Sequence, residues 1–140
     1  CDTLDAAKSS ISEDIHTANL AVMGTNTGFI ETMPGAKGGV RYTPDISAEK
    51  LLIFQNEFCA KIKDSTRILG VGFLYTSDIM FDTYIVNTLA TIFVKKFKNI
   101  DADYIATVET KGIPLATMVA HQLNLPLIII RREAKISVYY

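Results

Sequence analysis

The sequence has little cysteine, almost no net charge and no long hydrophobic run. Its 140 residues carry a formal net charge of −1, which excludes the whole-chain basic footprint of many nucleic-acid-binding proteins. No apolar run approaches the roughly 20 residues that cross a bilayer, so we expect no membrane partner. Cys1 and Cys59 are the two cysteines, and they lack metal-ligand spacing. We therefore expect no metal site, a free terminal thiol, a core thiol and a reducing, cytoplasmic location.

The first part of the chain predicts a helix and then a hairpin. Ser9 and Ser10, or Ser12, would cap the helix, and we expect residues 1–28 to form an N-terminal linker helix. The stretch 29–44 holds a Pro-Gly and a Gly-Gly pair between short apolar segments. This composition predicts a β-hairpin or a glycine-rich loop.

Helices and apolar strands alternate along the rest of the chain. Ser47 and Asp82 would cap two helices. A nearly continuous apolar run at 68–75, interrupted only by glycines, predicts a buried strand, and a helix at 113–124 separates strands at 103–108 and 127–130. This order is typical of an α/β fold with an open, mostly parallel sheet and helices on both faces. The residues expected to face the core are Leu51, Phe54, Phe58 and Ile62 on one helix and Val86, Leu89, Ala90, Phe93 and Phe97 on the next.

Glu109-Thr110-Lys111-Gly112 stands where the strand at 103–108 passes into the helix at 113–124. In open α/β sheets, ligands bind at the carboxyl ends of strands, and a helix N-terminus favours an anion. Lys111 would add positive charge, Thr110 a hydroxyl donor, and Gly112 room for a ligand near the backbone. Taken alone, the pattern also fits an ordinary connection, because it contains neither a Walker sequence nor G-x-G-x-x-G.

A second cationic segment follows the strand at 127–130. If the two strands are neighbours, as in most βαβ units, both loops open on one edge of the sheet. Glu109 and Glu133 would only partly offset the positive charge there. A pyrophosphate or a nucleotide would suit such a site. The cations that would converge on it are Lys111, Arg131, Arg132 and Lys135.

Two short sequences, VETKGIPLA and RREAK, resemble the phosphate loops of the type I phosphoribosyltransferases, in particular the orotate, adenine and xanthine enzymes. The resemblance implies that the first loop binds the pyrophosphate of phosphoribosyl pyrophosphate and contains a cis peptide bond at Glu109–Thr110. It also implies that Lys111, Arg131, Arg132 and Lys135 contact phosphates, some of them across a homodimer. The carboxylate of Glu109 is expected to make no ligand contact.

Three further sequences, KSSISEDI, PGAKGGVRYTP and ILGVGFLYTSDIM, are similar to the bacterial purine operon repressors. The likeness runs from about residue 8 to the end and implies an incomplete phosphoribosyltransferase-type effector domain over residues 29–140. In those repressors a winged-helix domain precedes this segment and contacts DNA, so we expect DNA binding through a domain outside this chain. The resemblance implies that Tyr42 contacts the base or the ribose of a ligand. The sequence is equally consistent with a tyrosine that only packs on a strand.

The resemblance to these repressors implies regulation without catalysis, so we expect no catalytic residue. It implies no required cofactor, with phosphoribosyl pyrophosphate as the effector, alone or with Mg²⁺. A purine or orotate phosphoribosyltransferase is the alternative. A third possibility is a regulator that binds another polyphosphate nucleotide at the same loops.

The hallmark ribose-phosphate sequence of the family, an acidic pair followed by a small-residue loop, is absent from these residues. A chain that starts with Cys1 and stops in the strand-like run 138–140 is expected to be a piece of a longer protein. The ribose-phosphate half of the site is therefore left unassigned. The remaining polar candidates read as helix-surface or turn residues: His16, His121, Asp101, Asp103, Lys95, Lys96 and Lys98.

Overall fold

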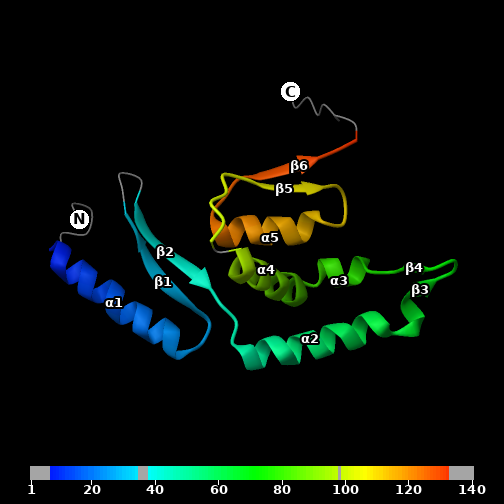
Figure 1. The fold of residues 1–140 in the computed structure, drawn as a ribbon, viewed down its shortest axis with the longest axis horizontal. Helices are drawn as coiled ribbons and strands as arrows, with labels where there is room; N and C mark the ends of the chain where they lie inside the picture. Colours follow the sequence, from blue (N-terminus) through cyan, green and yellow to red (C-terminus); the bar gives the residue numbers. More distant parts are fainter. Residues whose placement is uncertain (1–6, 35–37, 98, 133–140) are drawn as a thin grey trace. The chain divides into compact units, whose positions relative to one another are not determined.

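The computed structural model describes residues 7–34, 38–97 and 99–132 (Figure 1). The chain divides into two compact units, Cys1–Glu57 and Phe58–Tyr140. The boundary falls inside helix α2 (Ala48–Lys63). Among the described helices, none combines the length and the apolar composition that a membrane span requires.

The first unit contains helix α1 (Lys8–Gly24) packed on strand β1 (Gly28–Met33). The Asn19 side chain joins them, because its Oδ1 accepts the backbone N–H of Ile30 at 2.7 Å. The predicted serine cap is wrong. The helix begins before the serines, at Lys8 after Ala7, and no side chain caps it. The three serines therefore lie inside the helix and stay exposed.

Strand β1 pairs with β2 (Gly39–Pro44) in the predicted antiparallel hairpin. Glu31 lies opposite Arg41, and its Oε1 accepts from Arg41 Nη2 at 2.6 Å and Thr43 Oγ1 at 3.1 Å. Gly28 is needed at the hairpin end, because a Cβ there would collide with the Thr43 carbonyl oxygen and lie 2.7 Å from the Tyr42 ring. Cross-strand packing and charge therefore fix the register of this hairpin.

Helix α4 (Thr83–Phe97) follows the short helix α3 (Ser77–Phe81). The predicted cap is confirmed, since Asp82 Oδ1 accepts from the backbone N–H groups of Tyr84 at 3.0 Å and Ile85 at 3.1 Å. The prediction that Phe93 and Phe97 face the core is wrong. Both rings remain exposed and pair with each other at a centroid distance of 5.8 Å. Because apolar residues surround most of α4, their spacing in the sequence did not show which face of the helix is buried.

The most regular part of the second unit is a βαβ segment. Strand β5 (Ile105–Val108) pairs in parallel with β6 (Leu127–Ile130), and helix α5 (Ile113–Leu123) packs against both strands (Figure 1). Helix α4 also packs on α5. The predicted strand–helix–strand order is confirmed. The core of this segment is formed by Ala90, Val94 and Val119, with Ile105, Leu115, Met118 and Leu123 packed around them.

The predicted buried strand at 68–75 is wrong. Residues Ser65–Arg67 form a 3₁₀ turn, and the run then splits into two short antiparallel strands, β3 (Ile68–Leu69) and β4 (Phe73–Leu74). The large apolar side chains of both strands are exposed. The reason is local, because the run folds back in a tight turn at Gly70–Phe73 with positive φ at Val71 and Gly72, a conformation that Gly72 adopts easily.

The described residues therefore form a mixed α/β protein with three two-stranded sheets. Helix α5 covers one face of the β5–β6 pair. On the other face, Ala106, Val108, Ile128 and Ile130 are exposed. The wider open sheet and the phosphoribosyltransferase-like topology stay predictions.

Candidate functional site

The two predicted loops open on the same edge of the β5–β6 sheet. Val108 pairs with Ile130 at the carboxyl ends of the two parallel strands. The pairing continues one residue further, because the backbone N–H of Glu109 donates to the carbonyl of Ile130 at 3.1 Å. Glu109 and Arg131 are therefore the first residues to leave the sheet, and they leave it side by side.

An ion pair spans this edge. Arg131 Nε lies 3.5 Å from Glu109 Oε2, and both side chains are partly exposed. The sequence already contained the signal for the pair, since each residue is the first one after a strand of a βαβ unit. The pair partly neutralises Arg131, in line with the expectation that Glu109 partly offsets the positive charge of the site, but the direct contact between the two side chains was not predicted.

The N-terminus of helix α5 lies directly behind the first loop. The helix begins at Ile113, Gly112 occupies its N-cap position without a capping side chain, and Pro114 follows in the first turn. The positive end of the helix dipole is thus directed at the loop. The peptide bond Glu109–Thr110 is cis, as the family resemblance implies.

Gly112 has a structural role besides leaving room for a ligand. A Cβ at this position would lie 2.6 Å from Thr107 Oγ1, on the strand that leads into the loop. The φ angle of Gly112 is −76°, which any residue can adopt, so the requirement is steric and not conformational. The start of the helix therefore lies in close contact with β5.

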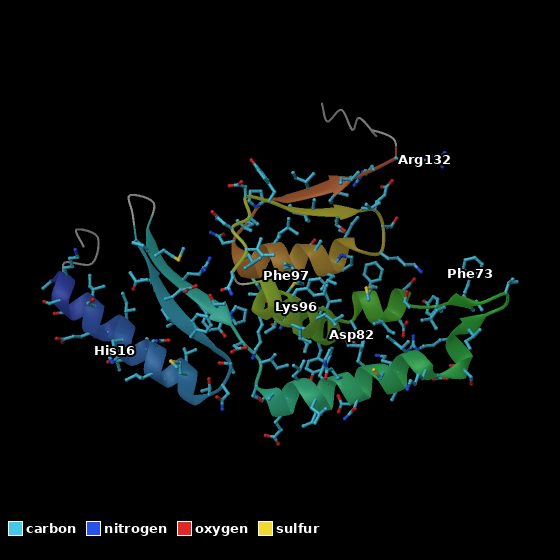
Figure 2. All side chains as sticks on the ribbon, viewed as in Figure 1. His16, Phe73, Asp82, Lys96, Phe97 and Arg132 are labelled. Atoms are coloured by element: carbon cyan, nitrogen blue, oxygen red, sulfur yellow. The ribbon has the colours of Figure 1, made fainter. Side chains whose placement is uncertain are left out.

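The remaining predicted loop residues are accessible to solvent. Thr110, Lys111 and Arg132 are exposed, and Figure 2 shows the labelled Arg132 just beyond β6. Lys135 and Glu133 lie outside the described residues. The structure thus places the loop of four residues and the segment that begins at Arg131 at one edge of the β5–β6 sheet, with the N-terminus of α5 behind the loop.

Tyr42 belongs to the first unit, on β2. Its hydroxyl donates to the carbonyl of Thr27 at 2.8 Å, and its ring lies against Gly28. These contacts fit a tyrosine that packs on a strand. Its role as a ligand contact stays a prediction.

The other polar candidates behave as surface residues. His16, which is labelled in Figure 2, and His121, Asp101 and Asp103 are all exposed. Within the described ranges, no group of three His, Cys, Asp or Glu side chains could hold a metal ion. Cys59 is a free thiol, but it is exposed on α2, so the prediction of a core thiol is wrong.

Shifted carboxylates in the second unit serve structure and lie outside the two loops. Hydrogen bonds from the Arg67 side chain hold the pKa of Asp78 below its ordinary value. The pKa of Asp82 is lowered first by the backbone N–H of Ile85 and also by Lys61, whose Nζ lies 3.5 Å from Asp82 Oδ2. The pKa of Asp64 is lowered by hydrogen bonds from Thr66. These shifts come from caps and ion pairs.

Comparison with known proteins finds similarity to bacterial regulators of purine biosynthesis. Residues 1–44 match the family model described as bacterial purine repressor, N-terminal. The probable purine biosynthesis transcriptional regulator PurR of Streptococcus pneumoniae is 40% identical over 133 residues, which are 95% of this chain and 48% of that protein. The resemblance to the purine operon repressors is thereby confirmed.

Of two further relatives, one is named as an activator and the other as a repressor. The purine biosynthesis transcriptional activator PurR of Lactococcus lactis is 36% identical over 133 residues, which are 95% of this chain and 49% of that protein. The purine biosynthesis transcriptional repressor PurR of Bacillus subtilis is 34% identical over 133 residues, 95% of this chain and 47% of that protein. The chain is thus homologous to regulators of purine biosynthesis, and it spans about half the length of the curated relatives it matches.

Proposed function

We propose that this chain is part of a purine biosynthesis regulator that senses phosphoribosyl pyrophosphate and does not catalyse its transfer. One observation carries the proposal: Glu109–Gly112 and Arg131–Arg132 leave neighbouring parallel strands at the N-terminus of α5. The relatives are named as transcriptional regulators, which favours sensing over catalysis.

The chemistry of this edge suits a pyrophosphate. Arg131 and Arg132 offer planar, fork-shaped donors that match phosphate oxygens, and Lys111 offers a mobile point charge. The helix N-terminus adds backbone donors and a favourable dipole. In this proposal the ligand competes with Glu109 for Arg131. The ion pair would then open when a polyanion binds.

The remaining parts of the site would come from outside the described residues. The exposed face of Val108, Ile128 and Ile130 supports a larger sheet, with helices on both sides as in the type I phosphoribosyltransferases. The ribose-phosphate loop would belong to that larger domain. The proposal includes a homodimer, a cytoplasmic location and Mg²⁺ as an accompanying ion of the pyrophosphate.

We also propose that the first unit contributes to DNA binding, in addition to the domain outside this chain that the family resemblance implies. The family model of the repressor N-terminus matches residues 1–44, which coincide with α1 and the β1–β2 hairpin. Ser9, Ser12 and His16 lie exposed on α1, and hydroxyl and imidazole groups bind phosphates and base edges. Ser9→Glu and Ser12→Glu should weaken binding to a purine-gene operator in a gel-shift assay. Unchanged operator affinity in both variants would remove α1 from the interface.

The test of the sensing proposal uses the full-length regulator. Calorimetric titration with phosphoribosyl pyrophosphate should show saturable binding, and the same ligand should change operator occupancy in a gel-shift assay. Steady turnover of a purine or orotate with phosphoribosyl pyrophosphate would favour the transferase alternative. If another polyphosphate nucleotide binds and phosphoribosyl pyrophosphate does not displace it, the assignment of the ligand is wrong.

A further inference from the structure

Three polar side chains link helix α4 to helix α5, at the end of α5 that lies away from the loop 109–112. Gln122 is the next-to-last residue of α5. Its Nε2 donates to Asn87 Oδ1 at 3.0 Å and to Thr91 Oγ1 at 3.2 Å, and both acceptors belong to residues of α4. We refer to Asn87, Thr91 and Gln122 as the α4–α5 polar cluster.

Thr91 is the buried member of this cluster, with 8% of its surface exposed. A buried hydroxyl is unfavourable unless it is hydrogen-bonded, and Thr91 Oγ1 donates to the backbone carbonyl of Asn87 at 3.1 Å within α4. That bond does not require Gln122, which is only half-buried. Loss of the Gln122 amide therefore leaves the Thr91 hydroxyl paired, and we expect it to change the free energy of unfolding little.

The apolar contact between the two helices is less directional than the polar cluster. It is centred on Ala90 and Val94 of α4 and Val119 of α5. Hydrophobic burial holds such surfaces together without a preferred direction, whereas the hydrogen bonds of Gln122 have restricted lengths and angles. A satisfied polar network specifies one arrangement of the elements that it joins. The polar cluster therefore determines how α5 is rotated and shifted on α4.

The start of α5 is held by a different kind of contact. A Cβ on Gly112 would lie 2.6 Å from Thr107 Oγ1, so the start of the helix approaches β5 closely and steric repulsion limits its movement towards the strand. Repulsion does not limit movement in other directions. The hydrogen bonds of Gln122, at the opposite end of the helix, add restraint in those directions.

We propose that Gln122 is a positioning residue for the pyrophosphate site, an inference that rests on the proposed function. Its bonds to α4 set the orientation of α5 and, with it, the position of the helix N-terminus behind the loop. Gln122 and Ile113 are about 14 Å apart along the helix axis, so a tilt of about 5° at Gln122 moves the first residue by roughly 1 Å. N–H donors bind oxygen acceptors well only over about 2.7–3.2 Å, and a displacement of this size therefore weakens phosphate binding.

Replacement of the amide tests this role in the full-length regulator. Gln122→Met keeps the length of the side chain and removes its hydrogen bonds. We expect the dissociation constant for phosphoribosyl pyrophosphate to rise about threefold to tenfold in calorimetry, with the Tm nearly unchanged. Gln55→Met is the matched control, because Gln55 is an exposed glutamine of α2. Unchanged affinity in Gln122→Met, together with weakened binding in Lys111→Glu, would overturn the positioning role and leave the proposed function in place.

A reciprocal variant separates positioning from a general loss of packing. Asn87→Gln combined with Gln122→Asn exchanges the two amides between the helices and keeps the summed length of the pair. The affinity should therefore return towards that of the unmodified regulator. A loss that this variant does not restore would assign the effect of Gln122→Met to packing and overturn the proposal.

A second readout requires no effector. The amide ¹H and ¹⁵N chemical shifts of Gly112 and Leu115 should change in Gln122→Met and return in the reciprocal variant, while Gln55→Met leaves them unchanged. If the unmodified regulator does not bind phosphoribosyl pyrophosphate, the proposed function fails, and these shifts alone decide whether Gln122 positions α5. Shifts that are the same in Gln122→Met and the unmodified regulator would refute the positioning role.

Discussion

Glu109 Oε2 lies 3.5 Å from Arg131 Nε, across the edge at which β5 and β6 end. The acidic partner comes from the loop before α5, and the basic partner from the segment after β6. The pair therefore links the two halves of the proposed pyrophosphate site. Because both side chains are partly exposed, it contributes about 0–1 kcal/mol to stability, and its main effect is on the charge that a ligand meets.

Removing the Glu109 carboxylate should strengthen binding of phosphoribosyl pyrophosphate. Glu109→Gln frees Arg131 and removes a negative charge from the site, so we expect the dissociation constant to fall by about twofold to tenfold at low salt. Calorimetry at two salt concentrations measures the change. Asp101→Asn is the control, because Asp101 is also an exposed carboxylate of this unit but precedes β5. Weaker binding in Glu109→Gln would indicate that the carboxylate contacts the ligand.

Reversing the charge of Lys111 should weaken effector binding and leave stability nearly unchanged. Lys111 is exposed in the loop, and substitutions at such positions usually change stability by less than about 0.5 kcal/mol. We expect Lys111→Glu to raise the dissociation constant more than tenfold. Lys96→Glu, an exposed lysine on α4, serves as the matched charge reversal. Equal affinities of the two variants would exclude Lys111 from the site.

Gly112 and Thr107 should behave as a coupled pair. Gly112→Ala places a methyl group 2.6 Å from Thr107 Oγ1, so either the Thr107 side chain or the loop has to shift, and we expect phosphoribosyl pyrophosphate affinity to fall. Adding Thr107→Ala removes that oxygen and should restore much of the lost affinity. A double-mutant cycle on binding measures the coupling. Additive losses would mean that Gly112 acts by leaving room for the ligand.

The Arg67–Asp78 pair should make stability depend on pH in the acidic range. The pKa of Asp78 in the folded protein lies below its ordinary value of 3.8. Its contribution is therefore complete above that value, and it is lost as the pH falls through the folded pKa. Asp78→Asn should lower the Tm at pH 7, and the difference from the unmodified protein should shrink towards pH 3. A difference that does not vary with pH would show that the ion pair is not its source.

Truncating a core side chain should have a much larger effect than truncating a surface one. Ile79 on α3 is completely buried, and Ile→Ala at such sites costs about 2–5 kcal/mol of unfolding free energy. Leu52→Ala on the exposed face of α2 should change it by less than about 0.5 kcal/mol. Denaturant unfolding of both variants measures the contrast. Equal losses would place Ile79 outside the core.

Helix-end residues and apolar strand sequences predicted the βαβ segment correctly. Pro114 and Asn124 marked the ends of α5, and Asn124 has the left-handed conformation that ends a helix. The continuous apolar strands on either side are typical of parallel pairing. The placement of both loops on one edge follows from that topology. The Glu109–Arg131 contact could have been inferred from the same register.

In two other segments, the sequence was not sufficient to predict which residues are buried. The apolar run at 68–75 has the composition of a buried strand, yet a tight turn with positive φ at Val71 and Gly72 makes it an exposed hairpin. On α4, apolar residues surround most of the helix, so its pattern did not show that Val94 would be buried and Phe93 exposed. In both cases burial depends on which other surfaces are present, and a single sequence does not contain that information.

The βαβ segment also has a consequence for how the protein folds. Glu109 and Arg131 are separated by one helix and one strand, so the edge they share requires no contact with a distant part of the chain. The parallel pairing of β5 and β6 still spans the helix between them, and such non-local pairing forms slowly. We therefore expect helix α5 to form first and the edge to be organised when the two strands pack on it. A site built in this way can persist through changes elsewhere in the chain, because its geometry is contained in one short stretch.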